Sequence, residues 1–297
     1  MTPSLGALLS FAVMSVIWGL TWIAIKFGVA AIPPFTFAGA RLFAAGAVLL
    51  ALARARGSAL PADASRSRIL IAGILVNTVS YGLVFWGMQF VPSGLASVVN
   101  LALIPVGLFS MGLIAGEETF SARKMLAIVI GVAGLVILFL PSLSFDADRR
   151  SLAGMLALVS GTLTYCCGSI LSRPLLRVSS PVPLAGWLTI IGGTGLIVLA
   201  LAFEPIDRSV LSAFLDPTVF ASWAFLVLGG SVVAFTLYLR LLRDWGPTRA
   251  GMYAFVSPII AVLLGVVVMH EPFGVYELAG SSFMLGAAGL AMSRRSS

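Results

Sequence analysis

Polar and aromatic side chains lie inside otherwise apolar stretches of this sequence, and their types could bind a small molecule. The stretch Ser15–Lys26, SVIWGLTWIAIK, places Trp18 and Trp22 four residues apart, on one face of a helix. Indole rings of membrane helices usually lie at headgroup level, yet Trp18 follows about 13 residues, roughly 20 Å, of helix. Trp18 could therefore line a central cavity or pack between helices. Trp22 is closer to the outer surface and is typical of an interfacial anchor.

Arg41 is a charged side chain within an apolar stretch. It follows the expected outer end of its span by about six residues, or roughly 9 Å of helix. A charge at that depth costs on the order of a few kcal/mol unless it finds a partner or water. Two interpretations stay open. The side chain could extend outward to the membrane surface, or it could be a counter-charge for a substrate carboxylate or for carbonyls freed by a kink.

Amide, phenol and further indole groups complete the set of candidates. Asn77 and Tyr81 lie four residues apart on one helical face. Such groups need hydrogen-bond partners in hydrocarbon, so each could simply bond a neighbouring helix. One cavity with aromatic walls and a few orienting polar groups would explain them together. The candidate substrate-binding residues are Trp18, Arg41, Asn77, Tyr81, Asn100, Tyr165, Trp187 and Tyr253.

The composition indicates whether these residues belong to a soluble protein or to a membrane protein. The chain has 297 residues, of which 60% are hydrophobic and 10% are charged, whereas soluble domains contain about 25% charged residues. We therefore expect an all-α integral membrane protein. The net charge of +7 does not indicate nucleic acid, because the basic residues lie between apolar runs instead of forming one patch with aromatic residues. The adjacent Cys166 and Cys167 are interpreted as packing residues.

A span needs about 20 apolar residues, and breaks at Pro, Gly and charge clusters divide the chain into ten. We expect these ten spans near residues 5–26, 35–53, 69–89, 93–114, 122–140, 151–172, 183–203, 218–239, 247–269 and 275–293.

The basic residues between these spans predict the orientation. Thirteen Lys and Arg residues fall in alternate connections and the C-terminal tail, and only four fall on the other side, namely Lys26, Arg149, Arg150 and Arg208. By the positive-inside rule, both termini are expected in the cytoplasm.

The two halves of the chain resemble each other. A shift of 153 residues aligns Asn100–Phe120 with Tyr253–Phe273, and a shift of 147 residues pairs Trp18 with Tyr165 and Lys26 with Arg173. Similarity by chance between two Leu-, Ala- and Gly-rich spans is the alternative. Because five spans per half is an odd number, a duplication would place the second half upside down, as in many secondary transporters. The matched positions include Pro105 with Pro258, Glu118 with Glu271 and Phe120 with Phe273.

These residues resemble the tandem EamA domains of the drug/metabolite transporter superfamily. The similar features are Trp18–Gly19, Arg41, the mid-span prolines Pro105 and Pro258, and the endings at Glu118 and Glu271. The resemblance covers residues 8–140 and 151–293 and implies a pseudo-symmetric bundle of ten helices in a bacterial inner membrane. Chain length and the aromatic first span are most similar to YddG-type exporters of aromatic amino acids, which implies that substrate class.

Pro105 and Pro258 are interpreted as hinges, because each removes a helix bond and kinks its span. The alternative is that Pro is simply frequent in membrane helices. No Asp or Glu falls mid-span, and the only histidine, His270, is at an outer edge beside Glu271. We therefore expect transport driven by the substrate gradient, with His270 and Glu271 as the candidates for proton coupling.

The expected function is export of small apolar or aromatic metabolites, most of all aromatic amino acids, by alternating access. A drug or other metabolite exporter of the same superfamily, with or without proton coupling, is one alternative. A lipid-handling or accessory membrane protein is another. No nucleotide-binding loop, metal-spaced ligand set or catalytic motif is present in the sequence, so we expect neither an enzyme nor a cofactor or metal. The expected partners are the substrate and the lipid bilayer, and the oligomeric state is left open.

Overall fold

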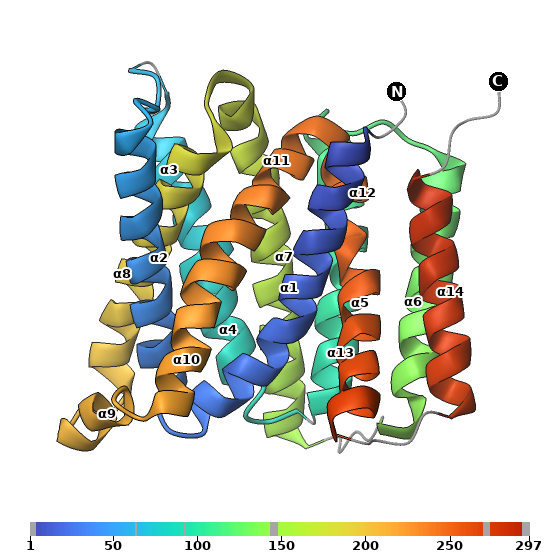
Figure 1. Ribbon diagram of the computed structural model, residues 1–297. Helices are drawn as coiled ribbons and strands as arrows, with labels where there is room; N and C mark the ends of the chain where they lie inside the picture. The colour runs from blue at the N-terminus through green and yellow to red at the C-terminus, as the bar shows by residue number, and fades with distance from the viewer. Residues whose placement is uncertain (1–3, 63, 92, 143–147, 270–273, 293–297) are drawn as a thin grey trace.

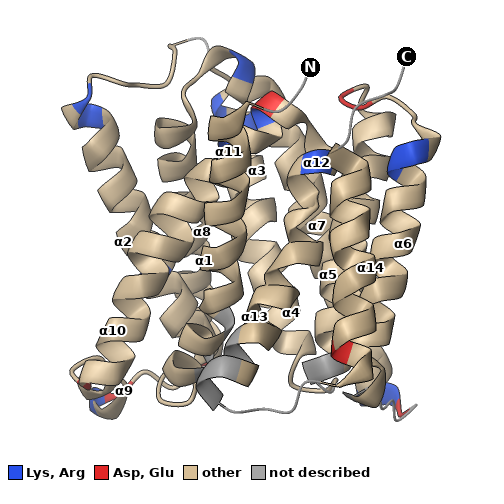
Figure 2. Cartoon of the chain, turned by 45° about the vertical axis from the view of Figure 1, so that its right-hand side comes forward, with Lys and Arg blue, Asp and Glu red and all other residues tan. Residues whose placement is uncertain are grey.

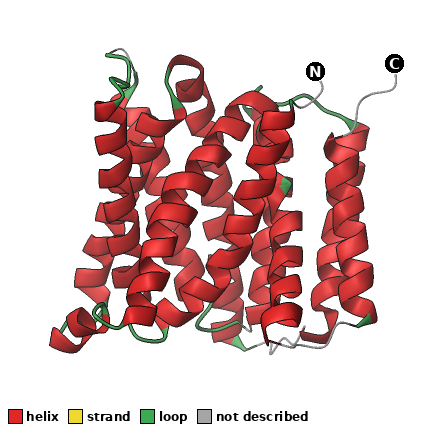
Figure 3. Ribbon diagram, in the orientation of Figure 1, coloured by secondary structure: helices red, strands yellow, loops and turns green. Residues whose placement is uncertain are grey.

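The computed structural model describes residues 4–62, 64–91, 93–142, 148–269 and 274–292. Within these ranges every regular element is a helix (Figure 3). The elements of the first half are α1 (Leu5–Val29), α2 (Pro34–Ala55), α3 (Arg66–Gly73), η1 (Ile74–Val79), α4 (Ser80–Gly87), α5 (Ser93–Ile114), α6 (Ala122–Phe139) and η2 (Leu140–Ser142). Those of the second half are α7 (Arg149–Val178), α8 (Pro181–Phe203), α9 (Arg208–Ala213), α10 (Pro217–Phe225), η3 (Leu226–Ala234), α11 (Phe235–Trp245), α12 (Pro247–Gly251), α13 (Tyr253–Met269) and α14 (Val275–Met292).

Nine helical stretches of the described residues are long and apolar enough to cross a membrane, and Pro247–Leu263 is a shorter apolar helix. The expected all-helical membrane architecture is confirmed. The boundaries differ where caps and charges decide them. For example, α7 continues to Val178, beyond the predicted residue 172, so Arg173 and Arg177 belong to the helix.

Two of the spans contain wide, π-helical turns that the sequence analysis did not predict. η1 joins α3 to α4, and η3 joins α10 to α11, each without a break in the helical rod. Single π-turns are rare within helices, and those that occur are often found at functional sites.

Helix starts follow local capping chemistry. Asp148 accepts a hydrogen bond from the backbone N–H of Ser151 at the start of α7, and Asp216 does the same for Thr218 and Val219 at the start of α10. These carboxylates satisfy donors that a helix leaves free at its N-terminus. Proline occupies the first turn of α2, α8, α10 and α12, where its missing N–H has no cost.

The helices of the two halves pack against each other (Figure 1). α2 runs beside α8, and α6 runs beside α14. The first helix of each half packs on the other half: α1 contacts α10, η3, α11 and α13, and α7 contacts α3, η1, α4 and α5. α1 begins and α14 ends at the same end of the molecule, which we call the terminal end, and most of the Lys and Arg residues lie there (Figure 2).

Glycine allows the close approach of α2 and α8. A Cβ atom on Gly193 would lie 2.4 Å from the backbone nitrogen of Phe43, and one on Gly46 would lie 2.6 Å from that of Ile190. Small residues at such contacts permit van der Waals packing between helix backbones, on which membrane helices depend in the absence of a hydrophobic driving force. The two helices thereby form one wall of the bundle.

Candidate functional site

Four aromatic rings from four different helices meet in the middle of the molecule. They are Trp18 of α1, Tyr165 of α7, Tyr238 of α11 and Tyr253 of α13, and we call them the aromatic cluster. The ring centroids of Trp18 and Tyr253 are 4.3 Å apart in an edge-on arrangement. Tyr238 lies 5.5 Å from Trp18 and 5.9 Å from each of the other tyrosines. Edge-on and offset contacts of this kind are the favoured geometries of aromatic pairs.

The polar atoms of the cluster are only partly satisfied. The hydroxyl of Tyr253 donates to that of Tyr165 at 3.2 Å, and Nε1 of Trp18 donates to the carbonyl oxygen of Gly230 at 3.1 Å. Gly230 belongs to η3, so a π-turn provides the acceptor that orients the indole ring. The hydroxyls of Tyr238 and Ser169 are buried, and neither has a partner of hydrogen-bonding geometry within the described part of the chain.

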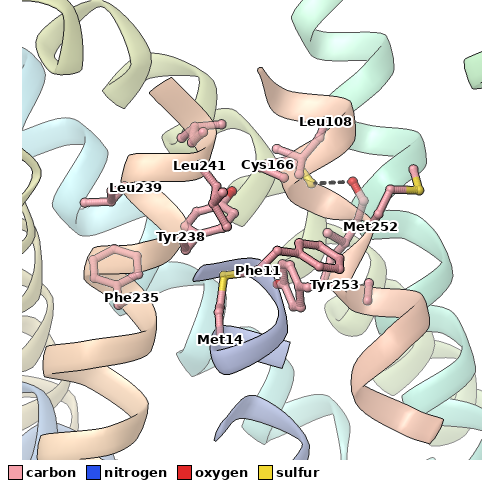
Figure 4. Close-up of a cluster of buried hydrophobic side chains, with 14 of the residues drawn as sticks. Phe11, Met14, Leu108, Cys166, Phe235, Tyr238, Leu239, Leu241, Met252 and Tyr253 are labelled. Atoms are coloured by element: carbon pink, nitrogen blue, oxygen red, sulfur yellow. Dashed lines mark hydrogen bonds between the residues drawn. The ribbon is translucent and has the colours of Figure 1, made fainter. Parts of the chain in front are cut away.

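Apolar side chains enclose these groups. Figure 4 shows Phe11 and Met14 of α1 near Tyr238 and Tyr253, and Phe235 of α11 next to Tyr238. Tyr238 and Met14 are completely buried. The rings therefore fill the centre in this conformation, and neither of the two cavities described below contains a member of the cluster.

Arg41 and Tyr81 form a second polar pair. Arg41 of α2 is only 5% exposed, and its Nη2 donates to the Tyr81 hydroxyl of α4 at 3.0 Å. The guanidinium carbon lies 5.4 Å from the centroid of the Tyr81 ring. The Nε atom is buried and has no partner among the described residues. The helix that carries Tyr81, α4, packs against α7, which carries Tyr165 of the aromatic cluster.

The two candidate asparagines link helices. Asn77 lies in η1 and donates from Nδ2 to the carbonyl oxygen of Leu188 in α8 at 2.9 Å. Asn100 in α5 donates to the Thr162 hydroxyl of α7 at 3.1 Å. Each amide thus has a protein partner, as a residue that joins helices would have.

The structure brings together three of the predicted residues, Trp18, Tyr165 and Tyr253, and separately pairs Arg41 with Tyr81. Trp187 lies apart, since its side chain on α8 is 45% exposed. The side chain of Trp22 lies outside the described residues, as do His270 and Glu271. The sequence analysis did not single out Tyr238, which lies two residues before Arg240 at the predicted end of its span. The helix continues beyond that predicted end, to Trp245. The shift of 153 residues aligns Tyr238 with Phe85, and this internal similarity was the sequence signal that could have identified Tyr238.

Pro105 and Pro258 both lie inside helices, in α5 and α13, and both are buried. α13 is preceded by the separate short helix α12, so the ninth expected span is interrupted at Met252. The hinge role of the prolines stays a prediction.

A network of charges joins elements at the terminal end. Glu117 accepts hydrogen bonds from Arg173 and Arg177 of α7. Glu118 pairs with Lys124 and accepts hydrogen bonds from the backbone and hydroxyl of Thr248, at 3.2 and 2.7 Å. Burial tends to raise the pKa of the Glu118 carboxyl, but the bonds from Lys124 and Thr248 outweigh it and lower the pKa. The connection between α5 and α6 thus binds α7 and α12.

Two cavities lie elsewhere. The larger, about 1070 Å³, is lined by the start of α2, by η1 and α4, and by the end of α8. Phe35 and Leu199 line it, and they pack against the same buried cluster as Tyr81, formed by Ala38, Leu42 and Leu196. Its carboxylate, Glu204, accepts hydrogen bonds from the backbone of Phe35 and Thr36 at 2.6 and 2.7 Å and so caps α2. The smaller, about 280 Å³, is an apolar recess between α5 and α6.

The fold and this interior define a multi-pass helical membrane protein with a polar and aromatic centre. Residues 5–140 and 152–293 match the EamA-like transporter family, and the chain belongs to that family. It is 32% identical to the "Uncharacterized inner membrane transporter YedA" of Escherichia coli K12, over 89% of this chain and 82% of that protein.

Further relatives agree with this assignment. The "Uncharacterized transporter YoaV" of Bacillus subtilis is 25% identical over 90% of both chains. "Protein PecM" of Dickeya dadantii is 24% identical over 91% of this chain and 87% of that protein. A solved structure titled only "Crystal structure of protein" matches with a TM-score of 0.82 at 20% identity, covering 98% of both chains, and shows the fold alone.

Proposed function

We propose that this chain is a secondary transporter of the bacterial inner membrane. It exports small apolar or aromatic metabolites, in the first place aromatic amino acids, by alternating access. The observation that carries this proposal is the aromatic cluster, because four rings from both halves of the chain meet there and one of their hydroxyls, that of Tyr238, lacks a partner among the described residues. Aromatic walls with few polar groups suit an apolar ligand of small size, and a site shared by both halves can change its access when the halves move.

The architecture in this proposal is ten spans in two five-helix units of inverted topology, residues 8–140 and 151–293. The contacts of α1 with the second unit correspond to the contacts of α7 with the first unit. The pairs α2–α8 and α6–α14 each join equivalent helices of the two units. α1 and α7 also begin at opposite ends of the bundle (Figure 1). The π-turn η1, shifted by 153 residues, falls within η3. These regularities support the duplication.

The orientation in this proposal places the terminal end, and therefore both termini, in the cytoplasm. The concentration of Lys and Arg at that end supports it. In this conformation the charge network of Glu117 and Glu118 links the elements there.

Counterflow of labelled L-tryptophan into proteoliposomes of the purified protein tests the function. We expect uptake that unlabelled tryptophan and phenylalanine suppress and that glutamate and lysine do not, with empty liposomes as the blank. Equal suppression by all four amino acids, or no uptake above the blank, contradicts the aromatic substrate class. Substrate-dependent acidification of the liposome lumen would indicate proton-coupled export instead of export driven by the substrate gradient.

Drug or other metabolite export is the second candidate, because the comparisons support the transporter class and not a substrate. Ethidium or another planar cation in the same counterflow assay separates the two. Competition by the cation and not by phenylalanine favours this second candidate.

A further inference from the structure

Arg41 is a buried cation without an anionic partner in the described part of the chain. Its side chain is 5% exposed, whereas the acidic residues Glu117, Glu118 and Asp244 form ion pairs at the terminal end. A buried charge is normally paired, since its transfer from water to a low-dielectric interior is costly. An ionisable residue inside a membrane protein therefore indicates a functional partner.

The fold does not require this cation. Under the shift of 147 residues, Arg41 of α2 corresponds to Leu188 of α8, and Leu188 is completely buried. The same place in the second unit is thus filled by an apolar side chain. A residue that differs between two otherwise similar halves is better explained by binding of an asymmetric ligand than by packing.

The guanidinium has donors to spare. Of its five N–H groups, the structure shows one hydrogen bond, from Nη2 to the Tyr81 hydroxyl, and Nε is buried without a partner. Because the Tyr81 oxygen accepts this bond, its own O–H is free to donate. Together they present several donors and one positive charge in a fixed orientation, which is the arrangement that binds a carboxylate by two hydrogen bonds.

Tyr81 of the pair is also carried by a helix that packs against a helix of the aromatic cluster, since α4, with Tyr81, packs against α7, with Tyr165. Tyr81 itself makes an edge-on contact with Phe85, with centroids 5.6 Å apart. We propose that Arg41 and Tyr81 bind the carboxylate of the transported molecule, so that a free acid group is required of every substrate. This inference rests on the proposed transport function and names the group that determines specificity at the same site.

Ligand binding to the purified protein tests this inference without transport. We would measure isothermal titration of indole-3-propionate, which has the ring and the acid, and of tryptamine, which has the ring and no acid. Short aliphatic acids and sodium chloride complete the series. We expect indole-3-propionate to bind at least about 10-fold more tightly than tryptamine, since charged hydrogen bonds contribute that much or more. Equal affinity for the two indoles overturns the proposal.

The variant Arg41→Gln has a shorter side chain that keeps part of the hydrogen bonding but not the charge. We expect it to lose the preference for the acid, and Tyr81→Phe to reduce it. The matched control is Arg56→Gln, since Arg56 is an exposed arginine just beyond the same helix. An unchanged preference in Arg41→Gln contradicts the proposal. If that variant does not fold, the two indoles in the unaltered protein and in Arg41→Lys still decide.

The outcomes separate the two proposals. If tryptophan is transported but the carboxylate makes no difference to binding, this inference fails alone. If no aromatic compound binds but aliphatic acids bind through Arg41, the aromatic substrate class fails and this inference holds. Competition by chloride at the same concentrations as the acids would show a site for inorganic anions only and would overturn it.

Discussion

At the scale of single residues, the centre of this protein combines satisfied and unsatisfied polar groups. Trp18, Tyr165 and Tyr253 have hydrogen-bond partners in the protein, whereas the Tyr238 hydroxyl has none that the structure describes. A buried hydroxyl without a partner costs about 1–3 kcal/mol. Retention of such a group is understandable if a ligand supplies the missing partner, because function can maintain a local cost in stability.

Removal of that hydroxyl gives a prediction with opposite signs for stability and activity. We expect Tyr238→Phe to leave the thermal unfolding midpoint in detergent unchanged or to raise it, and to lower tryptophan counterflow several-fold. Tyr165→Phe is the comparison, because it breaks the bond from Tyr253 and should lower stability by about 1 kcal/mol. A larger loss of thermal stability in Tyr238→Phe than in Tyr165→Phe would disagree with the structure.

At the scale of elements, the close contact of α2 with α8 explains why glycine is needed at particular positions of the sequence. The chain contains 31 glycines, but only some are needed at contacts. Gly193 is one of these, since no Cβ fits between it and the backbone of α2. Gly286 on the exposed face of α14 is not, since nothing lies within 4 Å of a Cβ there.

Alanine at these two positions should therefore have different effects. We expect Gly193→Ala to destabilise the protein by about 1–3 kcal/mol through overpacking, because a helix backbone cannot yield as a flexible side chain does. Gly286→Ala should be neutral, or stabilising by up to about 1 kcal/mol from helix propensity. Unfolding in a denaturing detergent series measures both. Similar midpoints for the two variants would show that the helices are less close than described.

The connection between α5 and α6 is the second element with a testable role. Glu118 has a pKa below its ordinary value of 4.5, so its ionised form is favoured by folding. Its contribution to stability is present above pH 4.5 and is lost as the pH falls through the lower, folded-state pKa.

We expect Glu118→Gln to unfold at a lower temperature than the unaltered protein at pH 7, and this difference to shrink as the medium becomes more acidic than pH 4.5. Asp244→Asn is the control, because its pairs with Arg240 and Arg243 are half-exposed and such pairs contribute little. A difference between Glu118→Gln and the unaltered protein that persists in acid would argue against an ionised Glu118 in the network.

At the scale of the whole molecule, the inverted units that we propose account for the regular contacts between the halves. Each first helix leaves its own unit and packs on the third and fourth spans of the other. The two units therefore share one interior, and neither encloses the aromatic cluster alone. Movement of one unit relative to the other must change the surroundings of all four rings together, which is what alternating access requires.

The orientation of the molecule can be measured by cysteine labelling in cells, after replacement of Cys166 and Cys167 by alanine. Ser67 lies in the first turn of α3 at the terminal end, and Ser212 lies in α9 at the opposite end; both are exposed. We expect an impermeant maleimide to label Ser212→Cys in intact cells and Ser67→Cys only after permeabilisation. The reverse pattern would invert the proposed orientation, and labelling of both in intact cells would contradict placement on opposite sides.

Much of the architecture could be predicted because hydrophobicity and charge act locally. The apolar runs marked the spans, the breaks at Pro and charge marked most ends to within a few residues, and Lys and Arg indicated a side. The π-turns η1 and η3 could not be predicted in this way, since one additional residue in a helical turn leaves composition unchanged. For the same reason the acceptor of Trp18, the Gly230 carbonyl, carried no signal in the sequence.

By itself, the sequence determined that this chain crosses a membrane many times and that aromatic and polar residues are present inside its spans. Only the tertiary structure decided which of them meet. Tyr238 belongs to the aromatic cluster, Arg41 donates a hydrogen bond to Tyr81, and Trp187 is exposed. The physical reason is that lipid tails and helix interfaces are equally apolar. The pattern that marks the buried face of a soluble helix is therefore weak here, and packing alone decides which residues face the centre.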